Sequence, residues 1–166
     1  MVCCKQKTAD EMLRSLVGWG MCIRGSAVAK NAEQRDDFKK LIVNFRAVAE
    51  RVMMIGGDVH FEWPTGCALW ADDAIEDMVL AYGLNKVCFH GCALGLRAQH
   101  GARRLIKKPW TIATTSANMF NGFATKRCSG EHQHSPCSGA DTKPTEEYTD
   151  EMTDIVHAAI HLAATL

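Results

Sequence analysis

Residues 56–70, GGDVHFEWPTGCALW, contain the change from a helix to a strand and from that strand to a loop. Gly56 and Gly57 are expected to end the preceding helix, because glycine accepts the left-handed conformation found at helix C-termini. Residues 58–62 alternate polar and apolar side chains, which is typical of a β-strand. Pro64 ends this strand because it has no backbone N–H to donate. The segment therefore predicts a short strand that opens into a loop.

Amphipathic segments surround this strand. Apolar residues recur every three or four positions across residues 33–54 and again from residue 149 onward, which predicts two helices with one buried face each. The elements expected between them are a helix over 72–82, strands over 86–90 and 110–115, and a helix over 116–124. Helices that alternate with short strands predict a small, mostly parallel sheet covered by helices. The expected fold is one α/β domain over residues 1–166 with a Rossmann-like architecture.

Two segments lack this periodicity. Residues 1–32 show no clean period, and their glycines interrupt the apolar runs, so an irregular N-terminal segment is expected. Residues 126–148 are rich in Ser, Gly, Pro and Thr, which predicts a loop too long for an ordinary connection. A loop of this length needs a functional or covalent reason.

The composition limits the class of protein. Nineteen Lys plus Arg balance nineteen Asp plus Glu, so contact with nucleic acid or an anionic membrane would need a local patch of charge. Charges interrupt every apolar stretch before about 18 residues, which excludes a transmembrane helix. The N-terminus has acidic residues where a signal peptide needs an apolar region. The eight cysteines are therefore expected as thiols or metal ligands in a reducing compartment, the cytoplasm or the nucleus.

Glu62 is the candidate catalytic residue. It lies at the carboxyl end of the first predicted strand, where open α/β sheets bind their ligands. A carboxyl group among Phe61, Trp63 and Trp70 would lose hydration, which would raise its pKa and suit it to donate a proton. The alternative is an edge carboxylate paired with a Lys or Arg.

The segment CSGEHQHSPC, residues 128–137, is the candidate metal site. It places two thiols and two imidazoles in ten residues of a polar loop, and the ligands expected from it are Cys128, His132, His134 and Cys137. Zinc binds thiolate and imidazole in a tetrahedron, and a metal would anchor this long loop. A site completed from elsewhere, by Cys67 or Cys92, is an equal alternative. The remaining alternative is a solvated His-rich turn.

The segment FHGCALGLRAQHGARRLIKKPW, residues 89–110, carries a cluster of cations without a single acid. The five cations are Arg97, Arg103, Arg104, Lys107 and Lys108. Such a patch can bind phosphate groups although the total charge is zero, so DNA or RNA is the expected partner. The alternative is a solvated basic loop.

Four motifs together resemble a known domain: GGDVHFEWPTGCALW, FHGCALGL, KKPWTIATTS and the Cys/His loop. They are similar to a domain of retroelement-type polyproteins, particularly those of dinoflagellates, which itself resembles the distal half of a cytosine-C5 DNA methyltransferase. The resemblance covers roughly residues 33–163. It implies a partial methyltransferase-like fold, with Glu62 contacting N3 of an extrahelical cytosine.

The chain departs from the methyltransferase pattern in two places. The family's nucleophile follows a proline, but the corresponding stretch SLVGWGMC has no Pro-Cys pair and Cys22 is its only thiol. The residues before it are too few for the βαβ unit of about thirty residues that would hold S-adenosylmethionine. We therefore expect no S-adenosylmethionine and no methyl transfer by this chain.

Three functions remain open from the sequence. The first is a truncated or degenerate methyltransferase-like module of a mobile element that binds nucleic acid or acts as a scaffold. The second is a structural subunit that packs on a protein partner. The third is a metal-dependent enzyme acting on nucleotides or nucleic acid, in which Glu62 is the acid or base and the metal activates water.

Overall fold

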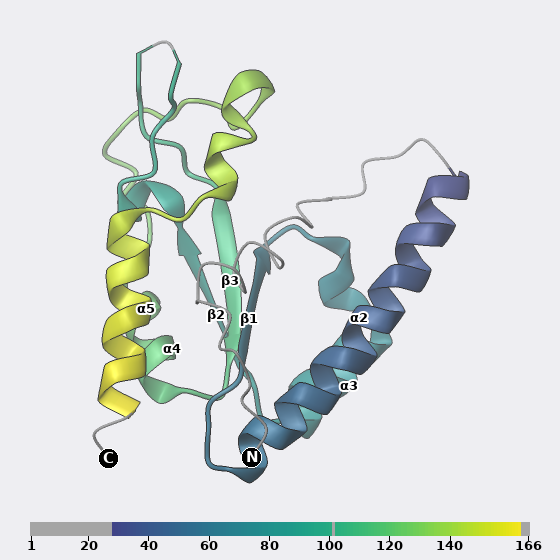
Figure 1. The fold of residues 1–166 in the computed structure, drawn as a ribbon. Coiled ribbons are helices and arrows are strands. Elements are labelled where there is room, and N and C mark those ends of the chain that lie inside the picture. The colour runs from purple at the N-terminus through teal and green to yellow at the C-terminus, as the bar shows by residue number, and fades with distance from the viewer. Residues whose placement is uncertain (1–27, 101, 164–166) are drawn as a thin grey trace, which may run out of the picture.

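The computed structural model describes residues 28–100 and 102–163. This part of the chain forms a sheet with helices on both faces (Figure 1). The elements are α2 (Val28–Met54), β1 (His60–Pro64), α3 (Asp73–Ala81), β2 (Asn85–His90), β3 (Pro109–Thr114), α4 (Ala117–Ala124) and α5 (Asp150–Ala163), with short 3-10 helices η1 (Ala68–Ala71), η2 (Gly91–Leu94), η3 (Gly139–Asp141) and η4 (Pro144–Glu146). Each helix and strand predicted from the sequence is present within this part of the chain.

The segments expected to be irregular are partly so. Helix α2 begins at Val28 and so includes the last residues of the segment expected to lack structure, while residues 1–27 lie outside the described part. Residues 126–148 form a loop with two short 3-10 helices. None of the described helices is long and apolar enough to cross a lipid bilayer.

The predicted parallel, Rossmann-like sheet is wrong. The strand order is β1-β3-β2, and β3 pairs with both neighbours in antiparallel fashion. Ile112 in the middle of β3 lies opposite Glu62 on one side and Val87 on the other. Strands β1 and β2 do run in the same direction, but β3 separates them.

The connection between β2 and β3 explains this arrangement. Residues 91–108 leave and return at the same end of the sheet, because His90 pairs with Pro109. A parallel neighbour would need a crossover that carries the chain to the opposite end, usually through a helix. This connection has only the short η2, so β3 must run back antiparallel between the strands that α3 joins.

Local signals begin and end the elements as the sequence predicts. The Asp72 carboxylate accepts a hydrogen bond from the Ala74 N–H (3.0 Å), and the Ser116 hydroxyl accepts one from the Met119 N–H (3.4 Å). Each bond satisfies a backbone donor at the first turn of a helix, α3 and α4 respectively. Gly56 ends α2 with a φ of 77°, in the left-handed region that glycine tolerates.

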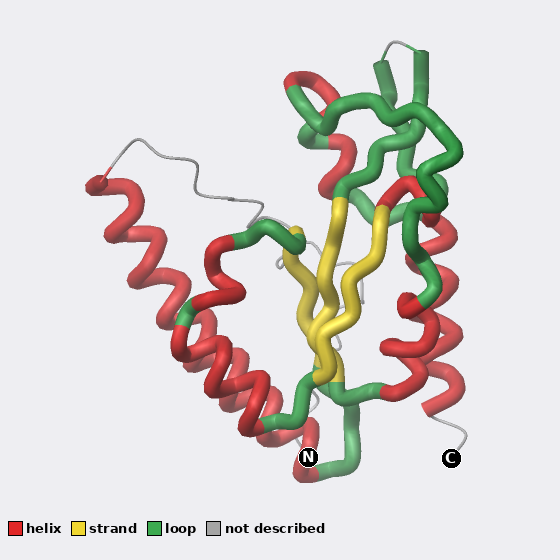
Figure 2. Tube along the Cα trace, turned by 180° about the vertical axis from the view of Figure 1, so that it is seen from behind, coloured by secondary structure: helices red, strands yellow, loops and turns green. Residues whose placement is uncertain are grey.

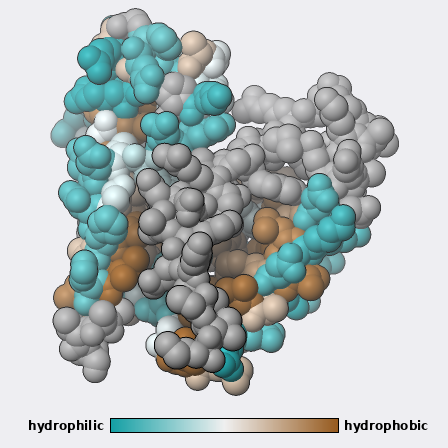
Figure 3. Space-filling view, in the orientation of Figure 1, coloured by the Kyte–Doolittle hydropathy of each residue, from teal (hydrophilic) through white to brown (hydrophobic). Residues whose placement is uncertain are grey.

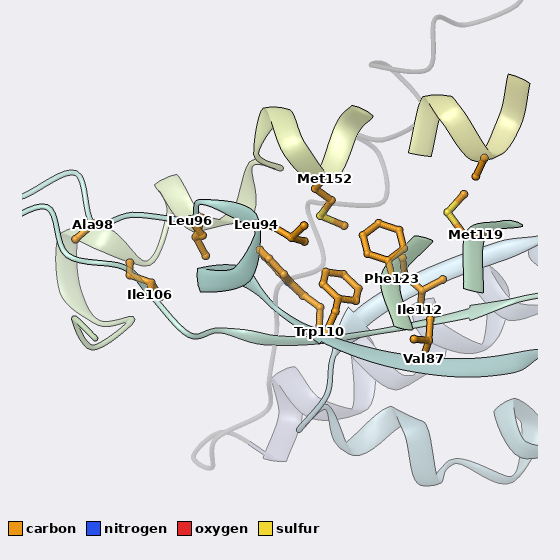
Figure 4. Packing of buried hydrophobic residues seen from close by; sticks show 12 residues of the cluster. Val87, Leu94, Leu96, Ala98, Ile106, Trp110, Ile112, Met119, Phe123 and Met152 are labelled. Carbon is orange, nitrogen blue, oxygen red and sulfur yellow. The ribbon is translucent and has the colours of Figure 1, made fainter. Parts of the chain in front are cut away.

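Two hydrophobic cores lie on opposite faces of the sheet (Figures 1 and 2). Helices α4 and α5 cover one face, where Phe89 and Phe123 pack with ring centroids 4.4 Å apart. Figure 4 shows that this core continues from Phe123 and Trp110 to Leu96 and Ile106, beyond the end of the sheet. Helices α2 and α3 cover the other face over an aromatic cluster. The rings of that cluster come from Phe38, Phe45, Phe61, Trp63 and Trp70.

Candidate metal centre and basic arm

Cys92 enters the site from η2, directly after β2. The turn packs closely against the core, since a Cβ on Gly91 would lie 2.6 Å from Leu96 Cδ2 and 3.1 Å from the Trp110 ring. The Gly91 N–H donates to the carbonyls of Lys107 and Lys108, which fixes the turn against the start of β3. Cys92 is buried at 5% exposure. The position of its thiol is therefore set by core packing.

Cys128 enters from the loop after α4, and His90 holds its backbone. The Cys128 N–H donates to His90 Nδ1 (2.8 Å), and the His90 N–H donates to the Lys126 carbonyl (2.9 Å). His90 Nδ1 therefore acts as an acceptor, which requires the proton of the neutral ring to lie on Nε2. Burial lowers the pKa of His90, and the nearby charges of Lys107 and Arg127 lower it further.

The thiols of Cys92 and Cys128 meet the imidazoles of His132 and His134. All four ligand atoms lie within 4.8 Å of one another. The Cys128 Sγ lies 3.8 Å from His132 Nε2 and 3.4 Å from His134 Nε2. A tetrahedron with metal–ligand bonds of 2.0–2.3 Å has edges of about 3.3–3.8 Å, so these two separations suit one central ion. The cluster could hold a metal ion.

The protonation of the cluster also suits a cation. Burial raises the pKa of the Cys92 thiol, and the neighbouring Cys128 thiol raises it further. Two thiolates side by side repel each other unless a positive charge lies between them. Partial burial lowers the pKa of His134, and His132 and Lys107 lower it further. A neutral imidazole is the form that binds metal.

An arm of two short strands rises beside this cluster. Residues 96–98 pair with 104–106 through the Ile106 N–H to the Leu96 carbonyl (2.9 Å) and the Ala98 N–H to the Arg104 carbonyl (3.0 Å). The Cys/His loop over residues 126–148 pairs with this arm through one bridge, since His134 pairs with Leu105 and the Ser135 N–H donates to the Leu105 carbonyl (2.8 Å). The arm projects beyond the sheet at the end that carries the Cys/His loop (Figures 1 and 2).

A carboxylate from the same loop holds the outer part of the arm. Asp141 Oδ1 accepts hydrogen bonds from the backbone N–H groups of Gln99 (2.8 Å) and His100 (3.2 Å). The loop over residues 126–148 thus contacts the arm near its middle and near its tip. This contact is one structural reason for the length of the loop.

Four of the five predicted cations lie on the surface of the arm or at its base. Arg97, Arg103, Arg104 and Lys107 are exposed. Arg103 has a φ of 48°, which places it in the sharp turn at the end of the arm. Lys108 differs, because it is half-buried, donates to the Thr145 carbonyl and lies 5.1 Å from the centroid of the Trp110 ring. Lys108 therefore connects β3 to the loop instead of joining the exposed group.

Glu62 lies on the opposite face of the sheet from the aromatic residues expected around it. Successive residues of a strand point to opposite faces, so Phe61 and Trp63 face the α2/α3 core while Glu62 faces Tyr148. The Tyr148 hydroxyl donates to Glu62 Oε2 (2.9 Å), and the buried Oε1 has no hydrogen-bond partner among the described residues. The prediction that Phe61, Trp63 and Trp70 surround the Glu62 carboxyl group was wrong.

The expected direction of the Glu62 pKa shift is confirmed. Burial raises the pKa of the carboxyl group to about 7, against smaller opposing effects of the Tyr148 hydrogen bond and the Lys108 charge. Burial beside Glu62 likewise raises the pKa of Tyr148. The pair therefore carries a neutral carboxylic acid at mildly acidic pH and a carboxylate above neutral pH.

The structure brings together three of the four loop residues expected as metal ligands. Cys128, His132 and His134 meet Cys92, one of the two outside residues considered from the sequence. Cys137 is exposed and lies apart, with its Sγ 3.2 Å from the Thr145 hydroxyl. Cys67 is buried and lies outside the cluster. None of the cysteines in the described part of the chain forms a disulfide.

Three supporting residues were not found from the sequence. His90 positions Cys128, Asp141 holds the arm, and Tyr148 contacts Glu62. Each contact joins residues more than 35 positions apart, so no local spacing could indicate it. Comparisons of the chain with protein-family models, with curated proteins and with solved structures found no match.

Proposed function

We propose that the chain is a nucleic-acid-binding module in which a zinc ion, held by Cys92, Cys128, His132 and His134, positions a basic arm. The observation that carries the proposal is the placement of the ligand cluster at the base of the arm, with His134 paired to Leu105. One residue thus belongs both to the metal site and to the strand ladder of the arm.

The donor set supports a structural ion. Two thiolates and two imidazoles complete a tetrahedron and leave no position for a water or a substrate, which is typical of structural zinc sites. Catalytic zinc usually has three protein ligands and an open position. The backbone around the cluster, including the Cys128 N–H on His90, fits a site that holds a loop in place.

Exposed charge supports nucleic acid as the partner. The arm carries exposed cations on a molecule whose total charge is zero, so an attraction to phosphate has to come from a local group of cations such as this one. Figure 3 shows mainly hydrophilic side chains over the end of the molecule that carries the arm and the Cys/His loop. The resemblance of the motifs to retroelement polyproteins supports the same class of partner.

The antiparallel sheet removes the methyltransferase-like architecture from this proposal. Open α/β folds that bind cofactors do so where neighbouring parallel strands diverge, and no such pair of neighbours exists in this sheet. No step of methyl transfer is therefore proposed. The proposal is therefore limited to nucleic-acid binding.

The metal part of the proposal is tested by titrating the full chain, stripped with a chelator, with Co²⁺ and then Zn²⁺. We expect one equivalent of cobalt with the visible absorption of a tetrahedral thiolate site, and its displacement by zinc. Cys128→Ser should abolish the spectrum, and the matched variant Cys137→Ser should keep it, since Cys137 lies outside the cluster. An unchanged spectrum in Cys128→Ser would contradict the assigned ligands.

The binding part is tested with the zinc-loaded chain and a mixed pool of labelled oligonucleotides, single- and double-stranded, DNA and RNA. We expect retention of some members of the pool, with an affinity that falls steeply with salt. Arg103→Glu with Arg104→Glu should weaken retention by at least about tenfold. The matched pair Lys39→Glu with Lys40→Glu, exposed on α2, should not. Absence of retention at low salt would end the proposal.

A second function is supported by Glu62. A carboxyl group with a pKa of about 7 and an unpaired buried oxygen is suited to act as a general acid or base at neutral pH. The corresponding enzyme would act on nucleotides or nucleic acid. Product analysis after incubation with nucleoside triphosphates and labelled oligonucleotides tests it. Turnover that is lost in Glu62→Gln supports this function, and no turnover by the zinc-loaded chain contradicts it.

A further inference from the structure

The arm is a two-stranded ribbon with one apolar and one cationic side. Leu96, Ala98 and Ile106 point inward and are at most 5% exposed, as part of the core under α5. The alternating residues Arg97 and Lys107 are exposed on the other side. The core therefore holds the ribbon from beneath and leaves Arg97 and Lys107 directed outward, while Arg104, opposite Ala98 in the ladder, is exposed farther out.

The ribbon is braced along its length. His134 of the Cys/His loop pairs with Leu105, and Asp141 accepts hydrogen bonds from the backbone of Gln99 and His100 near the tip. A braced ribbon keeps its arginines at set separations, which suits a rigid ligand with regularly spaced phosphates. A disordered basic loop would instead have to lose its conformational freedom on binding.

Aromatic rings that could stack on separate bases are absent from the exposed surface described over residues 37–162, apart from imidazoles. Every Phe, Tyr and Trp in this range whose exposure the structure describes is buried or half-buried. Proteins that bind single strands combine a cationic groove with exposed aromatic rings on which bases stack. The described surface offers cations without such rings, and so favours a partner whose bases remain paired.

We infer that the partner is double-stranded DNA, with the ribbon entering the major groove and its arginines on phosphates and base edges; this rests on the proposed function. The major groove of B-form DNA is about 12 Å wide and admits a two-stranded ribbon. The major groove of A-form RNA is too narrow for side chains to enter. The width of the major groove therefore favours double-stranded DNA over double-stranded RNA as the partner of the ribbon.

Cations at the base of the ribbon continue the contact. Lys107 and Arg127 are exposed and lie beside the end of β2, since the Gly91 N–H donates to the Lys107 carbonyl and the His90 N–H donates to the carbonyl of Lys126, the residue before Arg127. They flank the metal cluster where the ribbon joins the body of the molecule. This position suits phosphates at the edge of the groove, while Arg103 and Arg104 lie farther out on the ribbon.

The test measures fluorescence anisotropy of the zinc-loaded full chain with four probes of one sequence: duplex DNA, each separate DNA strand, and duplex RNA. We expect duplex DNA to bind at least about tenfold more tightly than the other probes at one salt concentration. Each phosphate contact contributes roughly −0.9 to the slope of log K against log salt. Arg103→Ala with Arg104→Ala should therefore make the slope shallower by roughly 0.9 for each of the two arginines that contacts a phosphate, up to about 1.8. Lys39→Ala with Lys40→Ala should leave it unchanged, and circular dichroism checks that each variant folds.

The outcomes separate this inference from the proposed function. Single strands or duplex RNA that bind as tightly as duplex DNA would overturn the inference and leave nucleic-acid binding intact. Tight duplex binding that ignores the arginine substitutions would overturn the role of the ribbon. A chain that binds none of the four probes would remove the proposed function itself.

Discussion

The surroundings of Glu62 follow from the rule that successive side chains of a strand point to opposite faces of the sheet. Its neighbours Phe61 and Trp63 face the α2/α3 core, whereas Glu62 is turned to the opposite face, where it contacts Tyr148. The buried carboxyl group therefore has one hydroxyl partner and one oxygen without any among the described residues. Such a group is stable when protonated and costly when charged.

Replacing Glu62 by Gln should change how stability depends on pH. The folded-state pKa is raised from 4.5 to about 7, so the folded protein binds a proton that the unfolded chain has lost in this window. The contribution of Glu62 is fully present below pH 4.5 and is lost as pH rises through about 7, by about 3 kcal/mol. Relative to the wild type, Glu62→Gln should gain that much stability between pH 4.5 and 8, measured by urea unfolding.

The matched control for this experiment is Glu131→Gln, because Glu131 is exposed. Its unfolding free energy should follow that of the wild type across the same pH range. Parallel curves for the wild type and Glu62→Gln would show that the carboxyl group does not carry the burial penalty. Comparison between variants also removes the contributions of the histidines, which titrate in the same window.

Cys92 and Cys137 show what spacing can and cannot identify. Both have a thiol, and Cys137 lies in the same ten-residue motif as the two imidazoles. The backbone of the loop turns Cys137 toward Thr145, whereas η2 brings Cys92 to the cluster from the end of β2. A ligand contributed by a distant element leaves no trace in local spacing.

At the scale of elements, Gly122 decides how closely α4 and α5 approach. A Cβ at this position would lie 2.7 Å from Ile155 Cγ2 on the facing helix. Ile155 is β-branched and cannot easily move its Cγ2 away. The absence of a side chain at Gly122 therefore permits the contact between the two helices that cover the main core.

Gly122→Ala should destabilise the protein although alanine is the better helix former. The gain in helix propensity is about 1 kcal/mol, while overpacking typically costs about 1–3 kcal/mol. In the background Ile155→Ala, where Cγ2 is absent, the same substitution should become stabilising by up to about 1 kcal/mol. Urea unfolding of the four proteins measures this change of sign, and strict additivity would contradict the proposed contact.

The basic arm is an element that periodicity could not predict. The cluster of cations indicated either a phosphate-binding patch or a solvated loop, and both alternatives treated residues 97–108 as one group. The structure divides them, because Lys108 turns inward to Thr145 while the other cations stay exposed. The pairing of Leu105 with His134, which belongs to another segment, makes the ribbon part of a ladder.

At the scale of the whole molecule, the two cores and the proposed metal site are expected to stabilise different regions. The two cores lie on the faces of the sheet and bury side chains such as Phe89, Phe123 and Ile75 completely. Burial of a side chain of this size contributes about 1.5–3 kcal/mol, so these cores do not depend on an ion. Leu96 and Ile106 attach the base of the arm to the main core, whereas its outer part and the loop over residues 126–148 have few such side chains and depend on hydrogen bonds and the Cys/His cluster.

Removal of the metal by a chelator should therefore act locally. We expect amide hydrogen exchange to accelerate in residues 98–105 and 128–137, because the cluster and the outer part of the arm come apart together. The amides of β1, β2 and β3 should keep their protection, since both cores remain. Hydrogen exchange with mass spectrometry measures this pattern, and Cys128→Ser should reproduce it without a chelator. Uniform loss of protection across the sheet would show that the metal holds the entire fold.

The sequence by itself determined the helices and strands of the described part, because capping residues, glycines and apolar spacing act over a few neighbouring positions. It also indicated the chemistry of the Cys/His loop and the raised pKa of Glu62. Tertiary structure alone decided that β3 inserts between β1 and β2, that Cys92 replaces Cys137, and that Tyr148 faces Glu62. These outcomes depend on contacts between residues far apart in the chain. Such contacts are selected by packing, in which strand direction and the path of one long connection outweigh any local pattern.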